Sequence, residues 1–102
     1  MVINVTDEDF EEKVIIKSME IPVVVDFWAT WCSLCLILSP ALEKFAEEDK
    51  GKFVLIKVNV DNARAKSQEY GIMSIPSVKI FKNGEVADEF VGAVPEENVK
   101  KW

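Results

Sequence analysis

The only two cysteines of the chain lie close together, in the segment Trp31-Cys32-Ser33-Leu34-Cys35. They follow an apolar run that predicts a strand, and they stand where a helix is expected to begin. Two intervening residues in the first turn of a helix bring both sulfur atoms within reach of a disulfide. The positive end of a helix also stabilises a thiolate, which is the species that attacks a disulfide. The spacing therefore indicates thiol–disulfide exchange chemistry.

Two other interpretations of the same spacing stay open at this point. A C-x-x-C segment can be half of a structural zinc site, but zinc prefers four ligands and the chain has no histidine and no further cysteine. Only a metal shared between two chains would then complete the site. The second alternative is a pair of inert buried cysteines, although a helix start is not their usual place. The lack of histidine also excludes Ser-His-Asp and Cys-His catalytic units.

Size and charge narrow the class of protein further. A chain of 102 residues predicts a single domain spanning 1–102. Twelve basic and eighteen acidic residues give a net charge of −6, which disfavours nucleic acid as a partner. The sequence has neither a span long enough to cross a membrane nor a basic start followed by an apolar run, so we expect a cytoplasmic protein without a membrane partner.

The apolar pattern predicts an alternation of strands and helices. Strands are expected at 2–5, 23–28, 53–60, 77–82 and 85–91, and helices at about 7–18, 33–49, 63–70 and from 95 onward. Thr6 and Asp9 form a variant of the capping box before the first helix, and Asn83-Gly84 predicts a hairpin turn. The order βαβαβαββα implies an α/β fold, in which a central mixed five-stranded sheet is flanked by about four helices.

Two charged residues stand inside strands that look buried. Asp26 lies among apolar neighbours, and burial raises the pKa of a carboxyl group because it disfavours the charge. Such an acid can take and give a proton near the sulfur atoms. Lys57 needs a partner, since an unpaired buried charge costs several kcal/mol. The alternatives are that Asp26 faces water at a sheet edge and that the Lys57 side chain extends to one.

Several motifs in order along the chain resemble the thioredoxin family. They are the segment from Asp26 to Cys35, then Pro40, the segment from Lys57 to Asp61, Ser74-Ile75-Pro76-Ser77, Asn83-Gly84 and Gly92. The resemblance covers nearly the whole chain and implies the thioredoxin fold. It also implies a monomeric protein-disulfide reductase without a bound cofactor, recharged by a thioredoxin reductase or a similar electron donor.

The resemblance also implies roles for individual residues. Cys32 would be the nucleophile and Cys35 the resolving cysteine of a Cys32–Cys35 redox disulfide, assisted by Asp26 and its partner Lys57. Substrate would bind along a rim formed by Trp31, Ile75, Pro76, Gly92 and Ala93, with Ile75-Pro76 in the cis form. Trp28 would pack beneath the site and donate to Asp61. Pro40 would lie inside one continuous helix, although Ser39-Pro40 by itself looks like a helix start.

The chain departs from the family between and after the cysteines. The usual site is Cys-Gly-Pro-Cys followed by Lys, whereas this chain has Ser33, Leu34 and Leu36. These residues are expected to tune the redox potential. Leu34 restores an amide N–H that proline lacks, which should stabilise the Cys32 thiolate, while the loss of a cation at position 36 acts in the opposite direction.

The same substitutions leave the substrate and the class of activity open. Leu34, Leu36 and Ile37 add apolar surface at the mouth of the site, which either binds a partner or packs beneath a neighbouring loop. The alternatives to a general reductase are a specialised disulfide oxidant or isomerase and a non-enzymatic binding module of the same fold.

Overall fold

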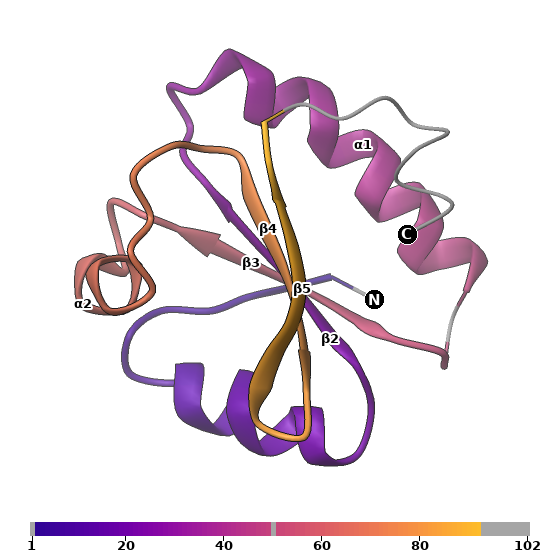
Figure 1. Cartoon of the computed structure of the whole chain (residues 1–102). Coiled ribbons are helices and arrows are strands. Elements are labelled where there is room, and N and C mark those ends of the chain that lie inside the picture. Colours follow the sequence, from indigo (N-terminus) through magenta and orange to yellow (C-terminus); the bar gives the residue numbers. More distant parts are fainter. Residues whose placement is uncertain (1, 50, 93–102) are drawn as a thin grey trace.

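The structure is a computed structural model that describes residues 2–49 and 51–92 of the chain. Five strands form one sheet in the order β1-β3-β2-β4-β5 (Figure 1). β1, β3 and β2 are parallel, whereas β4 pairs antiparallel with both β2 and β5. The strands are β1 (Val2–Asn4), β2 (Val23–Trp28), β3 (Val54–Asn59), β4 (Ser77–Lys82) and β5 (Glu85–Val91). The predicted mixed sheet of five strands is confirmed.

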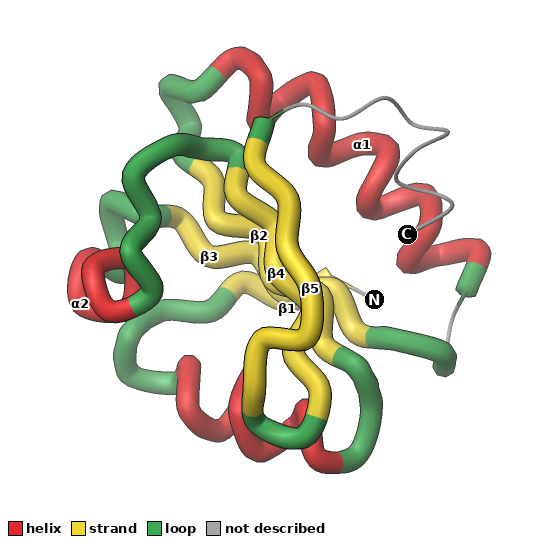
Figure 2. Tube along the Cα trace, viewed as in Figure 1, coloured by secondary structure: helices red, strands yellow, loops and turns green. Residues whose placement is uncertain are grey.

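Helices cover both faces of the sheet (Figure 2). α1 (Ser33–Glu48) lies on one face, and η1 (Glu11–Ile16), its continuation η2 (Lys17–Met19) and α2 (Arg64–Glu69) lie on the other. The described residues thus contain three helical segments, since η1 and η2 are continuous. The fourth predicted helix, from 95 onward, lies outside the described residues.

Each face of the sheet has its own apolar core. On the α1 face, Leu38 and Leu42 pack against Val24, Leu55 and other strand residues. On the opposite face, aromatic side chains dominate. Phe10, Phe27, Tyr70 and Phe81 contact one another there, with ring centroids 5.5–6.5 Å apart. Burial of each such phenylalanine stabilises the fold by roughly 1.5–3 kcal/mol.

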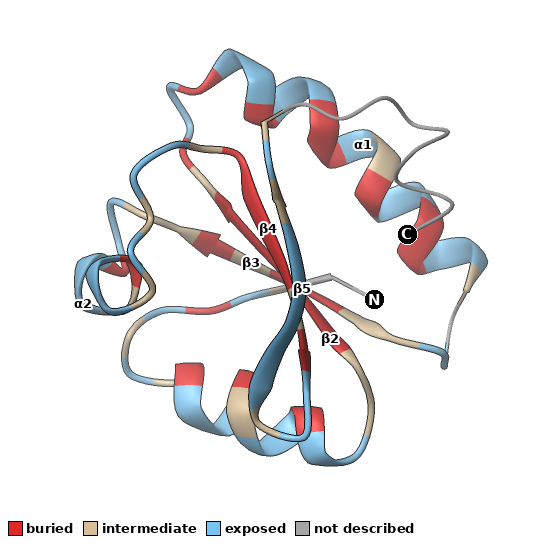
Figure 3. Ribbon diagram, viewed as in Figure 1, coloured by how far each residue is buried: buried red, intermediate tan, exposed pale blue. Residues whose placement is uncertain are grey.

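β2 is the central strand and is buried on both sides. Every residue from Val23 to Phe27 is buried, which explains why the segment shows no alternation of polar and apolar residues (Figure 3). Successive side chains still point to opposite faces, so Asp26 lies on the same face as Val24, beneath α1. By contrast, β5 at the edge of the sheet is mostly exposed.

The first helix begins later than the predicted residue 7, because acidic side chains near its start bind other groups. The Asp9 carboxylate accepts hydrogen bonds from the Thr6 backbone N–H and hydroxyl, at 2.7 and 3.2 Å, which forms one half of the predicted capping box. The Asp7 carboxylate accepts from the backbone N–H groups of Ala65 and Lys66 at the start of α2. Residues 7–9 therefore form a turn, and the helical conformation starts at Phe10.

The predicted hairpin turn at Asn83-Gly84 is confirmed. Both residues have a positive φ, of 53° and 83°, as a tight two-residue hairpin requires. The buried Ser18 at the end of the first helical segment holds this turn. Its hydroxyl accepts from Gly84 N–H at 2.8 Å and donates to the Ile15 carbonyl, and its own carbonyl accepts from Asn83 N–H.

We expect Ser18→Ala to lower the free energy of unfolding by about 1–3 kcal/mol, because the substitution leaves the Gly84 N–H without its acceptor. Ser67→Ala is the matched control. The Ser67 hydroxyl also donates to a helix carbonyl, that of Ala63, but this carbonyl keeps the Ser67 backbone N–H as a donor. The measurement is urea unfolding of both variants. Equal losses of stability would contradict the role of Ser18 in holding the turn.

Candidate active site

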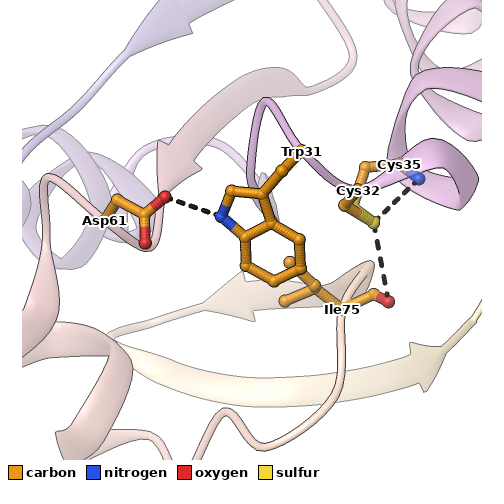
Figure 4. Close-up of a disulfide and its surroundings, with 5 residues drawn as sticks. All are labelled: Trp31, Cys32, Cys35, Asp61 and Ile75. Atoms are coloured by element: carbon orange, nitrogen blue, oxygen red, sulfur yellow. Dashed lines mark hydrogen bonds between the residues drawn. A yellow bond between two sulfur atoms is a disulfide. The ribbon is translucent and has the colours of Figure 1, made fainter.

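The two cysteines form a disulfide at the N-terminal end of α1 (Figure 4). Their Cα atoms are 5.3 Å apart, and Cys32 is the N-cap residue of the helix. Cys32 keeps 8% of its surface exposed, whereas Cys35 keeps only 1%. A partner that approaches from solvent therefore meets Cys32 first.

A backbone amide donates to the Cys32 sulfur, but it is not the one that the sequence suggested. The Cys35 N–H lies 3.1 Å from Cys32 Sγ, whereas the expectation from the missing proline was the N–H of Leu34. An N-cap side chain accepts from the second or third helical residue, and here the third is the donor. Cys35 supplies this amide whatever residue stands at position 34.

The partner of Asp61 is also different from the one expected. The indole of Trp31 donates to Asp61 Oδ2 at 2.8 Å, as Figure 4 shows, while Nε1 of Trp28 is buried and has no hydrogen-bond partner among the described residues. Trp31 is 69% exposed, so this bond holds a ring that would otherwise be free on the surface. Trp28 packs against the buried cluster around the disulfide, as expected.

The loop before β4 lies against the disulfide. The Ile75-Pro76 peptide bond is cis, as the family resemblance predicted. The Ile75 carbonyl oxygen lies 3.8 Å from Cys32 Sγ, and Gly92 N–H donates to the Pro76 carbonyl at 2.8 Å. The structure thus brings Ile75, Pro76 and Gly92 together at the site. Ala93, the remaining predicted member of the rim, lies outside the described residues.

Asp26 is buried on the α1 face of β2, with 1% of its surface exposed. Its Oδ1 atom has no hydrogen-bond partner among the described residues. Burial raises the pKa of Asp26 from 3.8 to about 7, the positive charge of Lys57 lowers it, and the negative charge of Glu43 raises it. The alternative of a water-facing carboxylate at a sheet edge is wrong.

Lys57 stands opposite Asp26 in the pairing of β2 with β3, but its ammonium group binds elsewhere. It donates to the hydroxyl of Ser39 at 2.8 Å and lies 4.3 Å from the centroid of the Trp28 ring. The predicted Asp26–Lys57 partnership is therefore electrostatic, acting through space, and not a direct ion pair within the described part of the chain.

The residues that distinguish this site from the family pattern lie on the outer side of α1. Leu34 and Leu36 are exposed, and Ser33 is exposed beside them. α1 continues through Pro40, as the family resemblance predicted, and not from a new start at Ser39. Pro40 lies on the exposed side of the helix and has no N–H to donate to the carbonyl four residues earlier. Water can bind that carbonyl instead.

Sequence reasoning missed Ser39 as a member of the site. It lies one helical turn after Cys35, on the same buried face of α1, and bridges Lys57 to the Glu43 carboxylate, to which it donates at 2.9 Å. The available signal was its spacing of four residues from Cys35. A serine on the inner face of an amphipathic helix needs a buried partner.

Neither a membrane-spanning helix nor a metal-binding cluster is present among residues 2–49 and 51–92. No helix there has the length and hydropathy to cross a membrane. No three side chains of histidine, cysteine, aspartate or glutamate gather there in a way that could hold a metal ion.

Comparisons with known proteins agree with this geometry. The family described as Thioredoxin matches residues 1–102. A thioredoxin from Rickettsia bellii is 44% identical, over the whole of this chain and 95% of the relative. Thioredoxin 1 from a Nostoc species is 42% identical over 90% of this chain and 84% of the relative. The chloroplastic thioredoxin M4 from Arabidopsis thaliana is 40% identical over 96% of this chain and 50% of the relative.

The family match covers the whole chain, and the relatives are similar over most or all of it. The disulfide at the start of α1 is consistent with both findings. The chain belongs to the thioredoxin family of thiol–disulfide oxidoreductases, and it is a protein-disulfide reductase with Cys32 and Cys35 as its active-site disulfide.

Proposed function

We propose that this reductase works with Cys32 as the attacking nucleophile and Cys35 as the resolving cysteine. The observation that carries the assignment is the asymmetry of the pair. Cys32 is the more exposed sulfur and caps α1, where the helix dipole and the Cys35 N–H stabilise a thiolate. Cys35 lies in the interior, bonded to the sulfur of Cys32 and shielded from an approaching substrate.

In the first step, the Cys32 thiolate attacks one sulfur of a substrate disulfide. A bond forms between Cys32 Sγ and that sulfur, the substrate S–S bond breaks, and the second substrate sulfur leaves as a thiolate that takes a proton from solvent. The Ile75 carbonyl beside Cys32 offers an acceptor to an extended substrate backbone, which would pair in a β-like manner along Pro76 and Gly92.

In the second step, the Cys35 thiol loses its proton and attacks Cys32 Sγ. The Cys32–Cys35 bond forms, the mixed disulfide breaks, and the remaining substrate sulfur leaves as a thiolate. Asp26 takes the proton of Cys35 and later returns it to solvent. Two electrons have then passed to the substrate, and a reductase restores the dithiol with two electrons and two protons. The family implies thioredoxin reductase as that donor.

Substitution of each cysteine tests the assignment. We expect Cys32→Ser to reduce the rate of insulin reduction by ~100-fold or more, since the more exposed of the two thiols is lost. Cys35→Ser should instead accumulate a covalent adduct with the substrate through Cys32, because the second step is blocked. The insulin assay measures the first result, and mass spectrometry of the trapped adducts measures the second. Adducts on Cys35 of the Cys32→Ser protein, formed at a comparable rate, would reverse the two roles.

The raised pKa of Asp26 predicts how stability depends on pH. Between about pH 4 and pH 7 the carboxyl is ionised in the unfolded chain but protonated in the folded one, so the free energy of unfolding falls as pH rises. The rise in the pKa of Asp26 from 3.8 to about 7 lowers the free energy of unfolding above pH 7 by roughly 4 kcal/mol, relative to a carboxyl with an unchanged pKa. Asp26→Asn should therefore be more stable than the wild type at pH 8, by an amount that shrinks towards pH 4.

Urea unfolding of the two oxidised proteins at several pH values measures this difference, and the titration of other groups cancels in the comparison. A constant difference across the range would contradict a raised pKa of Asp26. The same variant tests the proton transfer, since Asp26→Asn should slow the second step but leave the attack of Cys32 unchanged.

We also propose that the apolar outer side of the first two turns of α1 extends the substrate-binding surface. Leu34, Leu36 and Ile37 are exposed and adjoin the disulfide, with Trp31 held beside it by Asp61. The outer side of the later turns is charged, with Glu43, Lys44, Glu47 and Glu48. An apolar area continuous with a reactive disulfide favours substrates whose own disulfide is flanked by apolar residues.

Ile37→Gln tests this preference. The residue is 67% exposed, so the substitution should preserve the fold while it reduces kcat/KM by roughly three- to tenfold for a peptide disulfide with apolar flanks. The rate with oxidised glutathione, which is small and polar, should not change. Ile16→Gln is the control, at an isoleucine 56% exposed on η1, on the opposite face of the sheet. Equal effects of the two substitutions on the apolar peptide would contradict the proposal.

The sequence-based expectations on location and assembly remain part of this proposal. We place the protein in the cytoplasm as a monomer, because a protein-disulfide reductase works where thiols are kept reduced. Alkylation of thiols in intact cells, followed by separation of the oxidised and reduced forms, would report a largely reduced Cys32–Cys35 pair in that compartment. Sedimentation of the purified chain tests the monomer.

A further inference from the structure

Lys57 and Asp26 are placed so that a direct ion pair would be within reach. They stand opposite each other on neighbouring parallel strands, and both side chains point to the face that α1 covers. Neighbouring strands are about 4.8 Å apart, which is less than the length of a lysine side chain. The geometry of the strands alone thus favours contact between the ammonium group and the carboxylate.

The ammonium group is instead bound by a helix. Ser39 accepts from Lys57 Nζ at 2.8 Å and donates to Glu43 Oε2 at 2.9 Å, so one hydroxyl serves as acceptor and donor at once. Ser39 is buried, whereas Glu43 lies at the surface. The positive charge of Lys57 is therefore connected to a negative charge on α1 through a single hydroxyl.

Asp26 is left with few polar neighbours. The charged groups that act on it are Lys57 from β3 and Glu43 from α1. Its opposite residue on β4 is Val78, which is apolar, and the next residue, Lys79, points to the other face and pairs with Glu89. Oδ1 of Asp26 accordingly lacks a hydrogen-bond partner among the described residues.

We propose that Ser39 is a positioning residue, whose hydroxyl holds the Lys57 ammonium group away from Asp26 and so leaves the Asp26 carboxylate unpaired and free to accept the proton of Cys35. The last clause of this proposal rests on the proposed role of Asp26 in the second step, while the first can be measured without it. Ser39 lies one turn from Cys35, so the hydroxyl acts close to the sulfur that must lose its proton.

Removal of the hydroxyl tests the proposal. In Ser39→Ala, Lys57 loses its acceptor and its link to Glu43, and we expect its ammonium group to turn towards the Asp26 carboxylate, which stands opposite it in the sheet. An opposite charge within about 4–6 Å favours the ionised carboxylate and lowers its pKa by about 1–3. We therefore expect the titration of Asp26 in the oxidised protein, followed by carbon-13 NMR of its carboxyl group, to move at least about one pH unit lower. Ser39→Thr keeps the hydroxyl and should retain the wild-type titration.

A second background shows whether the effect passes through Lys57. In the Lys57→Met protein, Ser39→Ala should leave the titration of Asp26 unchanged, because no ammonium group remains to be released. An unchanged titration in Ser39→Ala, a lowered one in Ser39→Thr, or a shift that persists with Lys57→Met would each overturn the proposal.

The role of Asp26 in proton transfer and the effect of Ser39 on Lys57 can be tested separately. If Asp26→Asn resolves mixed disulfides as fast as the wild type, Asp26 has no role in proton transfer, while the NMR titration still decides whether Ser39 controls the position of Lys57. If both proposals hold, the pH at which resolution becomes fast should shift together with the titration of Asp26 in Ser39→Ala.

Discussion

Two thiols can join in a disulfide only if two protons leave with the two electrons, and one of the two sulfurs here is almost completely buried. Cys32 can exchange its proton at the surface, but Cys35 is separated from solvent. An acid–base group therefore has to lie within the fold. An ionised carboxylate in such a place costs several kcal/mol, so it stays neutral over part of the neutral pH range. Asp26, the group proposed for this role, is buried beneath α1, at a cost in stability that the two apolar cores have to offset.

The sheet topology makes this arrangement possible. β2 is flanked on both sides, by parallel β3 and by antiparallel β4. The disulfide follows the C-terminal end of β2, and the cis Ile75-Pro76 loop precedes the N-terminal end of β4. Because β2 and β4 are antiparallel, these two strand ends lie side by side. A central strand is also the place where an acidic side chain is most completely enclosed. The same strand thus supplies the buried acid and leads into the reactive sulfur.

Features that depend on local sequence were predictable, and those that depend on a choice between tertiary partners were not. The strand of 23–28, the hairpin at Asn83-Gly84 and the pairing of the cysteines follow from patterns a few residues long. The cis form of Ile75-Pro76 followed only from the family resemblance. In contrast, the indole that binds Asp61 and the acceptor of Lys57 were assigned to the wrong residues. Several groups of suitable chemistry lie within reach of each side chain, and the packing of the folded chain decides which of them it binds.

α1 connects the different parts of the site because its sides have different compositions. Its N-terminus holds Cys32, and its inner face carries Cys35 and then Ser39 one turn later, before the apolar residues that pack on the sheet. Its outer side is apolar beside the disulfide and charged farther along. Pro40 interrupts the hydrogen bonds on the exposed side only, so the inner face stays continuous from Cys35 to Phe45. One helix therefore places the proposed nucleophile, the proposed substrate surface and the hydroxyl that binds Lys57 in a fixed relation to the same pair of sulfur atoms.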